Sequence, residues 1–290
     1  MYRKIMSFLE AWKDSEHRKP LILQGARQVG KTYSILEFGR IHYENVAYFN
    51  FETNPKLNET FEENISPDYL IPILSHIAGQ TIVRVKTLIV FDEVQLCERA
   101  LTSLKYFCED APDYHIIVAG SLLGVAVNRA KFSFPVGKVD MKTLYPMDME
   151  EFMVACGESA LVEQIKKCFA EDKPLPSALH DAAMQLYRQY LIVGGMPECV
   201  MQFVETKDYI LVRHTQDTIL ASYLNDMSKY NNLNEIKKTR LAYDNITVQL
   251  SKKNTRFQYK LIKKGGRASE FENAIEWLCL SGIVSQVYKV

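Results

Sequence analysis

The first half of the chain alternates short apolar runs with stretches of helical periodicity. The apolar runs predict buried strands over residues 20–24, 46–51, 87–94, 115–120 and 136–144. Helical patterns lie between most of these runs, and the first of them follows the initial strand directly, over residues 32–40. This alternation predicts an α/β fold with a parallel sheet and helices on both faces. Ligands bind such sheets at the carboxyl ends of the strands.

From Met147 onward the pattern is helical. Asp148 is positioned to begin a helix, and Gly194-Gly195-Met196-Pro197 ends another, because paired glycines and a proline interrupt helices. The last sixty residues predict three helices followed by a strand over 283–288, the order of a winged-helix module. We therefore expect a core over 1–146, a helical lid or linker over 147–228, and a winged-helix-like domain over 229–290.

Composition narrows the class of protein. The chain of 290 residues has 47% apolar and 24% charged residues, ordinary values for a soluble globular protein. It contains no apolar run long enough for a membrane span, so no membrane association is expected. Its six cysteines are scattered without any C-x-x-C pair, which favours reduced thiols and a cytoplasmic location.

A phosphate-binding loop follows the first predicted strand. Its residues match the pattern G-x-x-x-x-G-K-[ST]: Gly25, Ala26, Arg27, Gln28, Val29, Gly30, Lys31 and Thr32. A glycine-rich turn into a helix N-terminus directs backbone N–H groups and the positive end of the helix dipole at one point. Lys31 is then expected to reach the β- and γ-phosphates, and Thr32 to ligate Mg²⁺.

Two further strands end in polar residues. The strand over 88–93 ends in Asp92, the predicted Mg²⁺ ligand, and Glu93, which is expected to orient and polarise the attacking water. Alone, this pattern also fits a buried strand that ends in surface acids. The strand over 115–120 is followed by Ser121, which would sense the γ-phosphate if this strand lies between the other two; the alternative is a plain Gly-Ser turn.

The C-terminal region is basic although the whole chain is neutral. Residues 229–267 contain eleven Lys and Arg against two acids, a local surplus of about nine positive charges. Such a surplus can face the phosphates of DNA. The alternative is a solvated face whose charge is offset by acidic segments such as residues 44–68.

Taken in order, several motifs resemble the prokaryotic AAA-type ATPases that carry a C-terminal domain of unknown function. The matching segments are residues 21–32, 91–95, 119–124, 134–139 and 194–198. The resemblance implies a P-loop ATPase core that binds ATP and Mg²⁺, a helical segment and a winged helix. Tyr33 joins residues 25–32 as a nucleotide-contacting position. A restriction-endonuclease-like domain usually follows in the family; this chain is expected to stop within the wing, so no nuclease chemistry is assigned.

Two positions qualify the resemblance. Gly195-Met196-Pro197 resembles the G-x-P motif of related signalling (STAND-like) NTPases, where the proline packs near the nucleotide base; a plain helix break is the alternative. Lys138 stands where many relatives have an arginine, and lysine lacks the planar fork of that side chain, which weakens an arginine-finger role there. Arg129 is a nearby substitute candidate, whereas Arg27 is expected to be structural or adenine-side.

The leading hypothesis from sequence is an Mg²⁺-dependent ATPase whose hydrolysis rearranges the core, the helical lid and the winged helix. The alternative is a slow nucleotide switch that signals through an assembly or a DNA site. The guanine-specifying N-K-x-D sequence is absent, which disfavours a GTPase. A homo-oligomer and a protein partner both stay open.

Overall fold

The computed structural model describes residues 1–120, 134–230, 233–252 and 256–287. Its first half contains a five-stranded sheet in the order β2-β3-β4-β1-β5. The strands are β1 (Leu21–Gln24), β2 (Asn45–Asn50), β3 (Thr87–Asp92), β4 (His115–Gly120) and β5 (Asp140–Thr143). Every pairing is parallel, which confirms the α/β prediction. The fifth strand is shorter than expected, and β4 lies between β1 and β3, as the interpretation of Ser121 requires.

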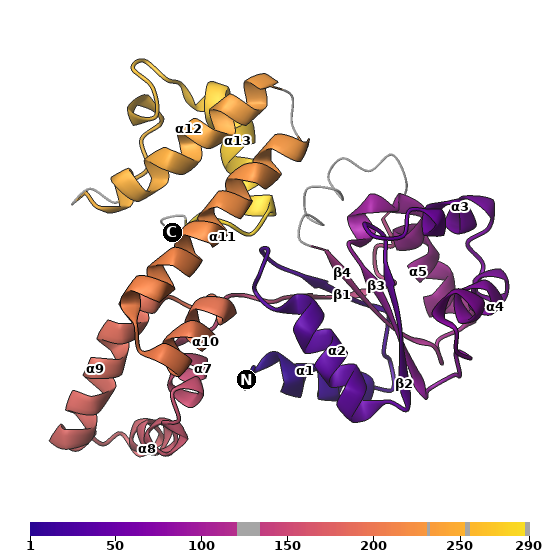
Figure 1. Cartoon of the computed structure of the whole chain (residues 1–290), viewed down its shortest axis with the longest axis horizontal. Helices are drawn as coiled ribbons and strands as arrows, with labels where there is room; N and C mark the ends of the chain where they lie inside the picture. The colour runs from indigo at the N-terminus through magenta and orange to yellow at the C-terminus, as the bar shows by residue number, and fades with distance from the viewer. Residues whose placement is uncertain (121–133, 231–232, 253–255, 288–290) are drawn as a thin grey trace.

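Helices cover both faces of this sheet (Figure 1). On one face, α1 (Ile5–Lys13) and α2 (Lys31–His42) pack against β1, β3 and β4. The other face is covered by α3 (Lys56–Glu63), α4 (Pro67–Ala78) and α5 (Glu98–Asp110). All residues of β3 and β4 are buried. Continuous apolar runs form these central strands because neither face meets water.

The second half is helical. It comprises α7 (Met149–Ala155), α8 (Ser159–Ala170), α9 (Ser177–Val193), α10 (Pro197–Thr206), α11 (Tyr209–Tyr230), α12 (Leu233–Leu250) and α13 (Ala268–Leu280). Asp148 begins α7 with a capping box, in which its carboxylate and that of Glu151 exchange hydrogen bonds with each other's backbone N–H groups. None of the described helices is long and apolar enough to cross a membrane.

The long helix α11 runs from the region of α9 and α10 to that of α12 and α13 (Figure 1). Its first part contributes Val212 and Ile219 to a core shared with α7 and α10, and its last part contributes Met227 to a core shared with α12 and α13. One helix therefore contributes apolar residues to both cores.

The predicted strand at 283–288 is wrong for its described residues, 283–287, which contain no strand. The N–H groups of Ile283 and Val284 donate to the carbonyl oxygen of Leu278, at 3.0 and 3.3 Å, and both side chains pack on the core around α13. The described part of 229–287 contains no strand at all, so this apolar segment has no strand edge to pair with. The middle helix expected there is a single 3₁₀ turn, η2 (Tyr259–Leu261).

Candidate nucleotide-binding site

The predicted phosphate loop connects β1 to α2 at the carboxyl edge of the sheet. Gly30 precedes the first residue of α2 with φ +90°, a left-handed conformation that favours glycine. Gly25 has φ +147°, and a Cβ there would lie 2.2 Å from the carbonyl oxygen of Leu144. The two glycines of the motif are thus required by backbone conformation and by close approach.

Lys31 extends back under this loop. Its side chain is buried, and Nζ donates to the carbonyl oxygens of Gly25 at 2.9 Å and Ala26 at 2.8 Å. No described carboxylate forms an ion pair with this ammonium group. Burial lowers the pKa of Lys31 to about 8, although the nearby Glu93 and Asp92 act in the opposite direction. An ammonium group held only by carbonyl oxygens in a buried site is suited to an anionic ligand.

The end of β3 meets the start of α2. The hydroxyl of Thr32 donates to Oδ2 of Asp92 at 2.8 Å, and the hydroxyl of Tyr48 donates to the same oxygen at 2.8 Å. The other carboxylate oxygen accepts the N–H of Glu93 at 3.0 Å. Asp92 is buried, so this carboxylate is fixed by three donors. Hydroxyl and carboxylate oxygens are the ligand types that Mg²⁺ prefers.

Tyr48 is a site residue that the sequence analysis missed. It lies on β2, whose parallel register places Asn50 opposite Asp92. Because side chains two apart share a face of a strand, Tyr48 and Asn50 both point to the side on which Asp92 lies, and Asn50 Nδ2 donates to the Tyr48 hydroxyl at 3.2 Å. A polar pair at the carboxyl end of a neighbouring strand is the pattern that identifies them.

Glu93 follows Asp92 in a left-handed conformation with φ +51°. Its carboxylate accepts a hydrogen bond from the side-chain amide of Gln95. Burial raises the pKa of Glu93, and the neighbouring Asp92 acts in the same direction, whereas Arg27 and Lys31 act against it. A carboxylate with a raised pKa is a stronger base than an exposed one.

The remaining sequence candidates are distributed differently. Ser121 and Arg129 lie outside the described residues, and Tyr33 is exposed on α2. Lys138 precedes β5 and forms an ion pair of 2.9 Å with Glu109 at the end of α5. In a parallel sheet, that is the amino edge of the strands, opposite the phosphate loop, so Lys138 is remote from the site of its own chain.

The helical half lies directly against the phosphate loop. The hydroxyl of Tyr223 on α11 donates to the carbonyl oxygen of Arg27 at 2.9 Å, and Arg27 Nε lies 2.6 Å from Oδ2 of Asp226 as an ion pair. A Cβ on Gly30 would lie 3.7 Å from Cγ of Pro197, and one on Gly282 would lie 3.0 Å from the backbone nitrogen of Ala26. Arg27 thus joins the loop to α11, while its expected role, structural or adenine-side, stays a prediction. Tyr223 and Asp226 had no local sequence pattern to mark them.

Comparisons with known proteins show which families and folds the chain is similar to. Residues 17–153 match the family model described as AAA domain, and residues 184–290 match a domain of unknown function (DUF8612). A Walker-type ATPase from Pyrococcus abyssi has the same fold over 97% of this chain and 89% of its own, with 14% identity and a TM-score of 0.54. The match to the ORC2 protein of Aeropyrum pernix covers 98% of this chain and 87% of that protein, with 12% identity and a TM-score of 0.45. No curated protein sequence matches significantly. The chain carries an AAA domain over residues 17–153 and has an AAA-type P-loop ATPase fold.

Proposed function

We propose that the chain binds ATP with Mg²⁺ and hydrolyses its terminal phosphoanhydride bond, and that hydrolysis changes the arrangement of the core and the helical half. The observation that carries this proposal is the hydrogen bond of 2.8 Å between Thr32 and Asp92. It joins the phosphate loop and the acid-tipped strand, two segments that the chain separates by 60 residues, into one pocket edge.

The residues present fit both ligands. For the triphosphate, Lys31 offers a buried ammonium group without a carboxylate partner among the described residues, and Gly30 and Lys31 offer N–H groups at the start of α2. For Mg²⁺, Thr32 and Asp92 offer oxygen ligands side by side. The bound metal ion would neutralise charge that develops on the phosphate oxygens.

Glu93 is the proposed base. Its carboxylate would take a proton from the attacking water while the bond between the γ-phosphorus and the β–γ bridging oxygen breaks, which yields ADP and inorganic phosphate. Burial supports this role because it raises the pKa of Glu93. Ser121 stays a proposed γ-phosphate sensor, and Pro197 a proposed contact beside the nucleotide.

Two variants test the proposal. Lys31→Ala should abolish binding of a fluorescent ATP analogue, because it removes the buried cation of the pocket. Glu93→Gln should leave the dissociation constant within about twofold but lower turnover by two orders of magnitude or more, roughly the contribution of a general base. Asp113→Asn is the matched control. Asp113 is exposed and lies just before β4, at the amino edge of the sheet, opposite the phosphate loop. Unchanged hydrolysis by Glu93→Gln would refute the role of Glu93.

A slow nucleotide switch is the second candidate, and the contacts of Tyr223 and Asp226 with the phosphate loop favour it. Through these contacts, a bound nucleotide would change the position of α11 even without rapid turnover. The single-turnover hydrolysis rate compared with the nucleotide dissociation rate separates the two. A switch that retains its nucleotide shows slow release and little turnover under substrate excess, whereas a working ATPase shows repeated turnover.

DNA is a proposed partner of the C-terminal region. Between Asp244 and Glu270 the sequence contains seven Lys and Arg and no acid. Exposed members of this group are Lys252, Arg256, Lys260, Lys263, Lys264 and Arg267.

A homo-oligomer, a protein partner and a cytoplasmic location also belong to the proposal. The cytoplasmic location is supported by the six cysteines, which are all free thiols.

A further inference from the structure

Arg3 connects three segments that are distant in the sequence. Its side chain is only 5% exposed, although it lies two residues before α1 near the N-terminus. Nη1 donates to the carbonyl oxygen of Val29 in the phosphate loop at 2.8 Å. Nη2 donates to the carbonyl oxygen of Tyr145 at 2.7 Å, and Nε donates to Oε1 of Glu151 at 3.2 Å. The planar guanidinium fork is required for these three directions, which a single ammonium group does not match.

The contact with Val29 fixes one peptide of the phosphate loop. In a trans peptide, the carbonyl oxygen and the following N–H group point in opposite directions. Because Arg3 holds the carbonyl oxygen of Val29, the N–H of Gly30 is directed to the other side of that peptide. Gly30 caps α2, so this N–H is one of the free donors at the helix start that bind anions. Within the described residues it donates to no backbone acceptor.

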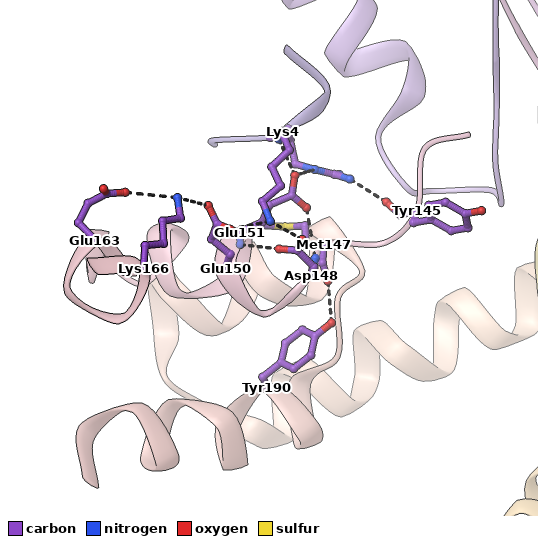
Figure 2. A network of polar contacts seen from close by, with 10 residues as sticks. Lys4, Tyr145, Met147, Asp148, Glu150, Glu151, Glu163, Lys166 and Tyr190 are labelled. Atoms are coloured by element: carbon purple, nitrogen blue, oxygen red, sulfur yellow. Dashed lines mark hydrogen bonds and ion pairs between the residues drawn. The ribbon is translucent and has the colours of Figure 1, made fainter. Parts of the chain in front are cut away.

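The contact with Glu151 ties Arg3 to the start of the helical half. Oε1 of Glu151 also accepts the backbone N–H of Lys4 at 2.6 Å, and Oε2 accepts the N–H of Asp148 at 3.2 Å. Figure 2 shows the side chains of Glu151 and Asp148 together at the beginning of α7, with Lys4 above them. The carboxylate is only 6% exposed and is satisfied on both oxygens. The position of Arg3 therefore follows the position of α7.

The segment around Tyr145 also contacts the helical half, which returns to the phosphate loop at Pro197. The N–H of Met147 donates to the carbonyl oxygen of Gly195 at 2.6 Å. The carbonyl oxygen of Met147 accepts a hydrogen bond of 2.8 Å from the hydroxyl of Tyr190, as Figure 2 shows. A Cβ on Gly195 would lie 2.1 Å from the Met147 oxygen, so this approach needs glycine. Two residues later, Pro197 lies beside Gly30, on which a Cβ would be 3.5 Å from Nη1 of Arg3.

We propose that Arg3 is a positioning residue for nucleotide binding: through Val29 it orients the Gly30 N–H, and through Glu151 and Tyr145 it makes that orientation depend on the seating of the helical half. This inference rests on the proposed function. A purely structural ion pair would hold α7 on the core without affecting the loop. Arg3 differs from such a pair because one of its three acceptors is the loop itself.

Lys4 provides a matched control. Its ammonium group contacts Asp148 and Glu150 at the start of α7, both at 2.7 Å, but it forms no ion pair or hydrogen bond with the phosphate loop in the described part of the chain, and its side chain is 43% exposed. The experiment compares the full-length wild type with Arg3→Met, Arg3→Lys and Lys4→Met. Binding of a fluorescent ATP analogue gives the dissociation constant, thermal unfolding gives stability, and hydrogen–deuterium exchange without nucleotide gives the order of residues 25–32.

We expect Arg3→Met to bind the analogue at least tenfold more weakly, about 1.4 kcal/mol, and to exchange faster over residues 25–32. Lys4→Met should match the wild type in both. Arg3→Lys should recover stability more than affinity, and it supplies the measurement if Arg3→Met does not fold. Equal affinity and equal loop exchange in all folded variants would overturn the proposal. If the wild type binds no nucleotide, the proposed function fails, while loop exchange still decides whether Arg3 orders the loop.

Discussion

Replacing Lys31 by methionine should stabilise the protein in the absence of nucleotide. The pKa of Lys31 is lowered from 10.5 to about 8 because the ammonium group is buried. At about 1.4 kcal/mol for each tenfold change in proton affinity, the charged group destabilises the folded state by about 3 kcal/mol at pH 7. Methionine removes the charge but leaves the carbonyl oxygens of Gly25 and Ala26 without this donor, at about 0.5–1.5 kcal/mol each. We expect a net gain of about 1 kcal/mol.

The pH dependence of this difference has a definite sign. Between about pH 8 and pH 10.5 the folded wild type loses the Lys31 proton while the unfolded chain keeps it. The unfolded state then binds more protons, so the free energy of unfolding rises with pH in this window. Lys31→Met has no such group. The stability of the wild type relative to Lys31→Met should therefore increase by up to about 3 kcal/mol from pH 8 to pH 10.5, and stay constant between pH 6 and pH 7.

The two tryptophans make the measurement specific. Trp12 is buried in the sheet core with α2, and Trp277 is buried in the C-terminal core. In a Trp277→Phe background, urea unfolding followed by fluorescence reports on the core that contains Lys31. ATP at 100 times its dissociation constant should add about 2.7 kcal/mol to the wild type and nothing to Lys31→Met. A stability difference that does not change between pH 7 and pH 10.5 would refute the reasoning.

Three further results follow from the site. Tyr223→Phe, which removes the donor to Arg27, should weaken nucleotide-induced protection of α11 in hydrogen exchange by about 0.5–1.5 kcal/mol, whereas Tyr209→Phe at the far end of α11 should not. Turnover should fall on acidification, because Glu93 acts only when ionised. Since the pKa of Glu93 is raised, the fall should begin at a higher pH than for an ordinary glutamate with a pKa of 4.5; a pH-independent rate would contradict this. Binding of duplex DNA to the basic C-terminal region should weaken steeply with salt, and a slope reduced by about two on neutralising Lys263 and Lys264 would locate the contact; a flat salt response excludes it.

The parts of the fold that sequence reasoning captured are those decided by local patterns. The order of strands and helices follows from apolar runs and helical periodicity, and the phosphate loop from consecutive residues with fixed backbone needs. The strand predicted at 283–288 is wrong for its described residues, 283–287, because an apolar run of that length forms a strand only beside another strand. Ile283 and Val284 instead pack on their own helix, and whether a partner strand exists is decided far away in the chain.

Within the site, the missed residues share one property: their partners are distant in sequence. Tyr48 reaches Asp92 across the strand register, 44 residues away, and Tyr223 reaches Arg27 over 196 residues. Arg3 stands beside Lys4 near the N-terminus, without a motif that distinguishes the two, and its three acceptors are two backbone carbonyl oxygens and one carboxylate. A backbone carbonyl carries no sequence signature, so such contacts are visible only once the chain is folded.

The distribution of these contacts decides how nucleotide binding reaches the second half. A ligand shifts an arrangement only as far as it interacts differently with the alternatives. Arg3 contacts the loop at Val29 and Pro197 lies beside Gly30, while Tyr223 and Asp226 contact the loop at Arg27. Because α10 and α11 both lie against the loop, we expect a displacement of the loop by bound phosphates to change the contacts of these two helices together. We then expect the long helix α11 to carry that change into the C-terminal core, since Met227 of α11 belongs to that core.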